Sequence, residues 1–162
     1  MRALGLRAEP KLLHWAVVEG TAEAPVLVGH DKAVPPVHVD EPEALGWYRE
    51  RLKFLIGKFA IDAVGIRIAE TFGRQGSLEP AMRRSRIEGV LFEGSYSCGK
   101  PVLAGALNQL SATLGSKSVK HYVDEGELRG LDFSKLPSQR KEAVLVGVAA
   151  LAAGGSNDES AS

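Results

Sequence analysis

Three short apolar runs stand close together at the start of the chain, and they constrain its fold more than any other feature. They cover residues 1–7, 12–19 and 26–29, and the breaks between them contain Gly and Pro. Apolar runs of this length bounded by Gly and Pro are typical of β-strands. Because the connections are too short for a crossover, the three strands are expected to form an antiparallel meander.

The rest of the chain alternates between helical and strand patterns. Asp40 and Glu43 have the spacing of a helix-capping box, and apolar side chains then recur at a helical period up to Phe59. Next come a strand at 61–68, a helix at 81–98, a short strand at 102–104, brief helices at 108–114 and 116–125, and a last helix at 139–152. This order predicts an α/β fold, with a mixed sheet of antiparallel and parallel strands and helices on both faces.

Length and composition indicate a single domain. The 162 residues include 20 basic and 20 acidic side chains, so the formal net charge is zero and any anion site must be local. One cysteine excludes a disulfide framework and suggests a reducing compartment. No apolar run is long enough to span a membrane and no leader opens the chain, so a cytoplasmic protein is expected. The domain is expected over residues 1–153, followed by a disordered polar tail at 154–162.

The last predicted helix is apolar on nearly every face after Glu142. Such a helix is normally buried or docked on a partner. Together with the zero net charge, it favours a protein partner or self-association as a homodimer over free binding to duplex DNA, which depends on a cationic surface.

Four segments resemble, in order, the RuvC-like Holliday-junction resolvases and their YqgF-like relatives in the ribonuclease H-like superfamily. MRALGLRAEP…LHWAVVEG takes the place of their first hairpin, and FAIDAVGIRIAETF is similar to their fourth strand. RRSRIEGVLFEGSYSCGKPV resembles their next helix and short strand, and LPSQRKEAVLVGVAAL resembles their last helix. A looser likeness, at Ile66-Arg67, is to a little-studied bacterial family of small proteins with the same layout. The resemblance covers most of residues 1–152 and implies a ribonuclease H-like fold.

The resemblance also implies a metal site, from which this chain departs. Resolvases of this type hold two Mg²⁺ ions on acids at the ends of strands one and four and on the last helix. The matching positions here are Arg7, Arg67, Gln139 and Glu142. Two carboxylates replaced by two guanidiniums change the local charge by about four units, which repels Mg²⁺. We therefore expect a catalytically degenerate, bacterial member without metal or cofactor, acting as a nucleic-acid-associated binding or assembly subunit.

The alternative is an active Mg²⁺-dependent, structure-specific endonuclease that uses a relocated cluster of Glu9, Glu70 and Glu142. Glu9 shares the face of Arg7 only if the strand continues through Ala8. Glu70 lies three residues past Arg67, which predicts the opposite face of an extended strand.

Arginines form the candidate anion or nucleic-acid site, which consists of Arg7, Arg67, Arg74, Arg83 and Arg86. Arg7 and Arg67 are expected at neighbouring strand ends facing Glu142, where they either bind a phosphate-like anion or form a bridge to Glu142. The other interpretation of Arg83, Arg84 and Arg86 is a solvated helix face on which Arg84 pairs with Glu88. His14, within an apolar strand, is expected to be a structural histidine.

Overall fold

A five-stranded mixed sheet forms the centre of the molecule in the computed structural model, which describes residues 1–70, 78–115 and 118–158. Its strands are β1 (Arg2–Glu9), β2 (Leu12–Gly20), β3 (Pro25–Ala33), β4 (Ala63–Arg67) and β5 (Val102–Gly105). The first three pair antiparallel, whereas β4 pairs parallel with β1 and β5 pairs parallel with β4. The order β3-β2-β1-β4-β5 confirms the predicted meander and mixed sheet.

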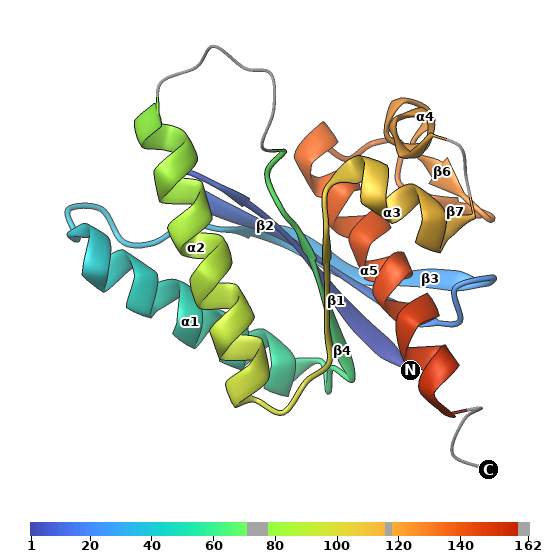
Figure 1. The fold of residues 1–162 in the computed structure, drawn as a ribbon, viewed down its shortest axis with the longest axis horizontal. Helices are drawn as coiled ribbons and strands as arrows, with labels where there is room; N and C mark the ends of the chain where they lie inside the picture. The colour runs from blue at the N-terminus through green and yellow to red at the C-terminus, as the bar shows by residue number, and fades with distance from the viewer. Residues whose placement is uncertain (71–77, 116–117, 159–162) are drawn as a thin grey trace.

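Helices cover both faces of this sheet (Figure 1). On one face lie α1 (Glu41–Lys58) and α2 (Leu78–Ser97). On the other face lies α5 (Ser138–Asp158), together with α3 (Leu107–Leu114), α4 (Val119–Glu125) and a hairpin of β6 (Glu127–Leu128) and β7 (Leu131–Asp132). Each face has its own apolar core, so strands β1 and β4 are buried on both sides.

Helix α1 begins where the capping residues predict. The Asp40 carboxylate accepts a hydrogen bond of 2.9 Å from the backbone N–H of Glu43, which satisfies one of the free donors at the helix start. Its buried side chains are Tyr48, Leu52, Leu55 and Ile56, which pack on the sheet. The helical periodicity in the sequence therefore identified the correct buried face.

Helix α5 lies directly on the backbone of β1 and β4. A Cβ atom at Gly5 would overlap the carbonyl oxygen of Ala143, and one at Gly65 would overlap the carbonyl oxygen of Val146. Glycine at these two positions lets the helix approach the sheet closely. Residues 143–151 of α5 are buried, and α3 and α4 cover the side that faces away from the sheet. The chain itself thus buries the apolar last helix, and this helix is no evidence for a partner.

Two predicted boundaries are wrong. Strand β1 continues through Ala8 to Glu9, because Glu9 still pairs with Leu12 across the tight turn. Helix α5 continues to Asp158, so the disordered tail does not begin at residue 154; Gly154 packs against the Met1 side chain, and adding residues to an existing helix costs little. Residues 159–162 lie outside the described part of the chain. The β6–β7 hairpin was not predicted, because two-residue strands leave no periodic pattern.

None of the helices in the described residues is long and apolar enough to cross a membrane.

Candidate functional site

The carboxyl ends of β1 and β4 bring Arg7 and Arg67 side by side. The two residues are partners in the parallel register of these strands, which are neighbours at the centre of the sheet. On the other side of β1, Arg7 is paired with His14 of β2. Carboxyl ends of parallel strands are the usual place for functional side chains in α/β folds. The predicted position of the two arginines therefore corresponds to the observed one.

Glu142, near the start of α5, bridges the two guanidiniums. Its Oε2 atom lies 3.2 Å from Nε of Arg7, in a hydrogen bond, and 3.1 Å from Nε of Arg67. The side chains are 15%, 6% and 12% exposed for Arg7, Arg67 and Glu142. One carboxylate oxygen thus faces two largely buried cations. We call these three residues the Arg–Glu bridge; of the two arrangements considered for the arginines, it is the one present in the structure.

Glu9 and Glu70, the other two acids of the proposed relocated cluster, each form a longer ion pair with one of the same arginines. Glu9 Oε1 lies 3.6 Å from Nη1 of Arg7, and Glu70 Oε1 lies 3.5 Å from Nη2 of Arg67. Glu9 was expected to share the face of Arg7 only if the strand continued through Ala8, and β1 does continue through Ala8 to Glu9. The expectation for Glu70 is wrong, because β4 ends at Arg67 and the extended alternation of side chains no longer applies beyond it.

A second ion pair, on α2, borders the site at the end of β4. Arg84 Nε lies 2.8 Å from Oε1 of Glu88, which also accepts a hydrogen bond of 3.0 Å from the backbone N–H of Ala69. Arg84 in turn donates to the backbone carbonyl of Arg67. The predicted pair exists, but its side chains are only 14% and 10% exposed, so the interpretation as a solvated face is wrong for this pair. Burial, and then the nearby charge of Arg7, lower the pKa of Arg84.

The other candidate arginines are engaged elsewhere. Arg83 Nε lies 3.0 Å from Oε1 of Glu79 in an exposed pair one helical turn away. Arg86 Nη1 lies 2.8 Å from Oε1 of Glu41 and so ties α2 to the start of α1. Arg74 lies outside the described residues. The candidate arginines therefore form no single cluster in the described part of the chain.

His14 also belongs to the site, although the sequence pattern assigned this histidine only a structural role. Its side chain is nearly buried, and Nε2 lies 3.1 Å from Oε2 of Glu9. Nδ1 has no hydrogen-bond partner among the described residues. Burial lowers the pKa of His14, although the neighbouring Glu9 carboxylate acts in the opposite direction. Only the register of β1 against β2 reveals that His14 stands beside Arg7.

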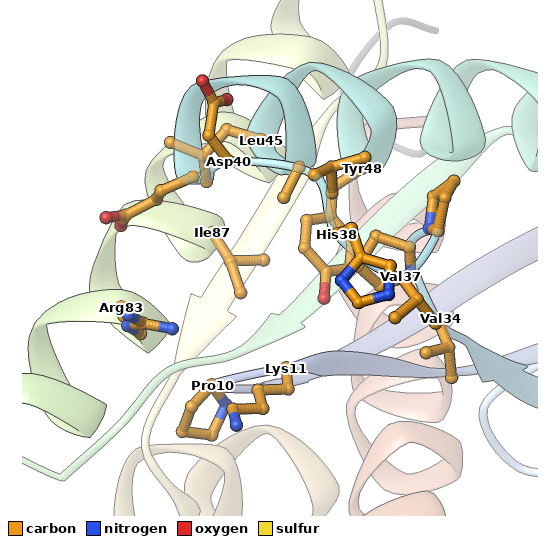
Figure 2. A pocket seen from close by; sticks show the side chains of 15 residues that line it. Pro10, Lys11, Val34, Val37, His38, Asp40, Leu45, Tyr48, Arg83 and Ile87 are labelled. Carbon is orange, nitrogen blue, oxygen red and sulfur yellow. The ribbon is translucent and has the colours of Figure 1, made fainter.

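A pocket of about 520 Å³ opens between the β1–β2 turn and the first turns of α1 and α2. Figure 2 shows the turn after β1, the loop before α1, and the first turns of α1 and α2 around it. Lys11 and Arg83 bring positive charge to its wall, and Val37 and Ile87 bring apolar surface. Burial raises the pKa of Tyr48, also in this wall, to about 12. None of the three residues of the Arg–Glu bridge lines this pocket.

The charges of the site nearly cancel. Arg7, Arg67 and Arg84 supply three guanidiniums, and four carboxylates oppose them, from Glu9, Glu70, Glu88 and Glu142. Each carboxylate contacts a guanidinium. In the described ranges, no three His, Cys, Asp or Glu side chains are placed to hold a metal ion together. The arrangement is that of an ion-pair network between the sheet, α2 and α5.

Comparison with known proteins places the fold. The sequence matches no protein-family model and no curated protein. Solved structures similar to it include Thermus thermophilus RuvC, with 21% identity over 97% of each chain and a TM-score of 0.76. T. thermophilus RuvC in complex with a Holliday junction substrate has 20% identity, covering 92% of this chain and 91% of that one, with a TM-score of 0.70. The yeast mitochondrial Holliday junction resolvase has 9% identity, covering 97% and 80%, with a TM-score of 0.65. The chain therefore has the ribonuclease H-like fold of the RuvC-type resolvases, as the sequence predicted.

Proposed function

We propose that this chain is a non-catalytic RuvC-like domain that acts as a nucleic-acid-associated binding or assembly subunit. The observation that carries the proposal is the Arg–Glu bridge. At the ends of β1 and β4, where the resemblance to resolvases implies metal-binding acids, two guanidiniums share one carboxylate oxygen of Glu142. An ion pair now occupies the position expected for a metal centre.

The residues at this position do not fit two Mg²⁺ ions. Magnesium is bound through carboxylate oxygens and water, and the carboxylates of Glu9, Glu70 and Glu142 each face an arginine instead. Two dications would add four positive charges to a network whose four carboxylates are already nearly neutralised by three guanidiniums. Because Coulomb repulsion is strong where side chains are buried, the network opposes metal binding.

Association with nucleic acid is supported by the fold and by the local cations. One of the similar structures is a RuvC in complex with a Holliday junction substrate. In this chain, the pocket between the β1–β2 turn, α1 and α2 has Lys11 and Arg83 on its wall. Since the net charge of the chain is zero, such local cations would have to supply the attraction for phosphate groups.

Self-association is supported by the outer face of α2. Large exposed side chains stand at both ends of this face, and the small Ser85 and Gly89 stand between them. The large ones are Leu78, Met82, Phe92 and Tyr96, which are 72%, 40%, 39% and 82% exposed. With Ser85 and Gly89, they alternate at steps of four and three residues, the pattern of a helix–helix seam. We call these six residues the α2 stripe.

The α2 stripe is complementary to a second copy of itself. If two α2 helices cross antiparallel at a two-fold axis between Ser85 and Gly89, Met82 meets Phe92 and Leu78 meets Tyr96. The small central pair allows the backbones to come close, and the contact of Met82 sulfur with the Phe92 ring stabilises each half of the seam. A symmetric dimer interface of this kind uses the same surface on both subunits.

The test is to assay binding and cleavage side by side. The full chain is titrated into a labelled four-way DNA junction and a matched linear duplex, with EDTA, Mg²⁺ or Mn²⁺ present. Binding with no metal-dependent cleavage is the expected result. Absence of binding to either DNA, and to single-stranded DNA, would overturn the nucleic-acid association.

The competing endonuclease is tested by the same assay. Metal-dependent cleavage that disappears in Glu142→Gln and in Glu9→Gln, but persists in the control Glu50→Gln on the exposed face of α1, would overturn the non-catalytic proposal. Two separate variants are used because Glu142→Gln also removes the bridging charge. A folded Glu9→Gln variant keeps the result interpretable.

A further inference from the structure

A second hollow, of about 470 Å³, lies between α1 and the ends of β2 and β3. The side chains that matter for its chemistry come from both walls; they are Trp15, Asp31 and Lys32 on the sheet and Arg51, Phe54 and Lys58 on α1. We call this hollow the α1 groove. It contains none of the residues of the Arg–Glu bridge. Val34 lines both the α1 groove and the 520 Å³ pocket between the β1–β2 turn, α1 and α2, so the two hollows are neighbours.

Cations and aromatic rings alternate along the wall that α1 contributes. Arg51 Cζ lies 5.1 Å from the ring centroid of Trp47 and 5.5 Å from that of Phe54. Lys58 Nζ lies 5.6 Å from the centroid of Phe54 and 5.3 Å from that of Phe59. Ring faces attract a cation without using its N–H donors as a carboxylate does. The rings therefore hold both charged groups in place and leave donors free for a ligand.

The cations of the α1 groove differ from the other cations of the same helix. Arg49 and Lys53, on the neighbouring faces of α1, form ion pairs with Glu93 and Glu50. Within the described residues, neither Arg51 nor Lys58 has a carboxylate within ion-pairing distance. Unpaired cations concentrated at a groove favour an anionic partner.

The excess of positive charge in the α1 groove also favours an anionic partner. Lys32, Arg51 and Lys58 bring three positive charges, and the only carboxylate among the lining residues is Asp31, which accepts a hydrogen bond from the backbone N–H of Lys32. The seven residue steps from Arg51 to Lys58 span about 10 Å of helix axis. Two cations at that separation can contact different phosphates of one strand.

We propose that the α1 groove binds single-stranded nucleic acid, with phosphates at Arg51 and Lys58 and a base on the exposed ring of Phe54. Phe54 is 51% exposed, which leaves much of its surface available for stacking. Cationic grooves with interleaved aromatic rings bind single strands through backbone charge and base stacking. This inference rests on the proposed association with nucleic acid and locates one contact surface outside the Arg–Glu bridge.

Fluorescence anisotropy of a labelled single-stranded DNA of mixed sequence tests the phosphate contacts, with full-length chain titrated at several salt concentrations. The variant Arg51→Gln/Lys58→Gln is compared with the control Arg49→Gln/Lys53→Gln, which removes the same charge from other faces of α1. The groove variant should flatten the plot of log affinity against log salt by about 1.4 and weaken binding at least tenfold, because two phosphate contacts are lost. The control should retain the wild-type slope.

Phe54→Ala tests the stacking contact separately. It should weaken binding by about tenfold and change the salt slope less than the groove variant does, because a stacked base contributes no counterion release. Trp15, in the wall of the groove, provides an independent signal: in a Trp47→Phe background, its fluorescence should change on addition of unlabelled oligonucleotide. Thermal unfolding of each variant checks that it is folded.

Three results would overturn the inference. Equal weakening by the groove and control variants would mean that only general charge attracts DNA. Displacement by poly-glutamate as effective as by the oligonucleotide would indicate an acidic peptide as the occupant. If the wild-type chain binds the four-way junction but not single-stranded DNA, the α1 groove proposal fails and the proposed function stands, whereas a wild-type chain that binds no nucleic acid would overturn both.

Discussion

At the scale of single residues, Glu142 is the side chain on which the site depends. It is the acid shared by Arg7 and Arg67, and all three side chains are at most 15% exposed. Removing one member of a buried ion-pair network leaves uncompensated charge in a poorly solvated place. The two arginines would then repel each other at the centre of the sheet.

Glu142→Gln should therefore lower the free energy of unfolding by about 3–5 kcal/mol, measured by urea denaturation. Glu70→Gln is the matched control, because the Glu70 side chain is 53% exposed and its ion pair with Arg67 should contribute about 1 kcal/mol or less. The triple variant Arg7→Leu/Arg67→Leu/Glu142→Leu should recover much of the loss, since apolar packing can replace a buried network. Similar stabilities for Glu142→Gln and Glu70→Gln would contradict the bridge.

His14 should make stability depend on pH. Burial lowers its pKa in the folded state, so below pH 6.5 the unfolded chain binds a proton that folded His14 does not. Stability should then fall as the pH decreases from 7.5 to 5.5, by up to about 1.4 kcal/mol per pH unit. His14→Gln should flatten this dependence, and the control His121→Gln, on exposed α4, should not. Since burial also lowers the pKa of His30, some slope should remain. An unchanged slope in His14→Gln would rule out this role.

Sequence reasoning found part of this site, and the missing residues show its limit. Arg7, Arg67 and Glu142 were predicted to meet because a resemblance aligned them with known strand ends. His14, Arg84 and Glu88 were not predicted to take part. His14 joins through the register of β1 and β2, and the α2 pair joins through its packing over the end of β4. Both depend on contacts between segments distant in sequence, which leave no local pattern.

At the scale of elements, α5 packs so closely on the sheet that two strand positions beneath it require glycine. The backbone of α5 passes over Gly5 in β1 and Gly65 in β4, and neither position has room for a Cβ atom. The same contact sets the position of Glu142 at the start of α5. The close packing at Gly5 and Gly65 therefore also holds Glu142 within reach of Arg7 and Arg67.

Gly5→Ala should destabilise the fold by at least 1–3 kcal/mol, because the added methyl group meets backbone and the helix must shift. Gly57→Ala is the control: its Cβ would meet open space in α1, and replacing a helical glycine by alanine should stabilise by about 0.5–1 kcal/mol. Chemical denaturation of both variants measures the difference. Equal effects of the two changes would show that α5 does not pack this closely.

The interpretation of α5 from sequence was half right. Its apolar composition correctly predicted burial, but composition cannot identify what covers a helix. The cover comes from α3 and α4, short segments whose apolar residues Leu110, Leu114 and Val119 carry a weak periodic signal. The apolar composition of α5 therefore does not indicate a protein partner. Self-association is indicated instead by the exposed apolar residues of α2.

At the scale of the whole molecule, the α2 stripe predicts a dimer in solution. Gly89→Glu should convert it to a monomer, because a long charged side chain would separate the helices at their closest point. Gly57→Glu is the matched control, a glycine in α1 with equally open surroundings. Light scattering coupled to size-exclusion chromatography measures the mass of each variant. A monomeric wild-type chain, or a Gly89→Glu variant that remains dimeric, would exclude this interface.

The fold as a whole was predictable to the level of element order and sheet type. Short apolar runs identified the strands of the meander, and the capping pair Asp40 and Glu43 identified the start of α1. Local patterns could not predict which strands from the two halves of the chain pair with each other. The insertion of β1 between β2 and β4 depends on pairing across about sixty residues.

The position of α5 at the end of the chain has a consequence for how the protein is made. The meander β1–β3 is complete at Ala33, but the helix that covers one of its apolar faces begins only at Ser138. At translation rates of about 5–20 residues per second, that face stays uncovered for roughly 5–20 s on each ribosome. During this interval the nascent sheet exposes apolar surface and unpaired strand edges, the features that promote aggregation. Efficient production of this domain should therefore depend on chaperones that bind nascent chains.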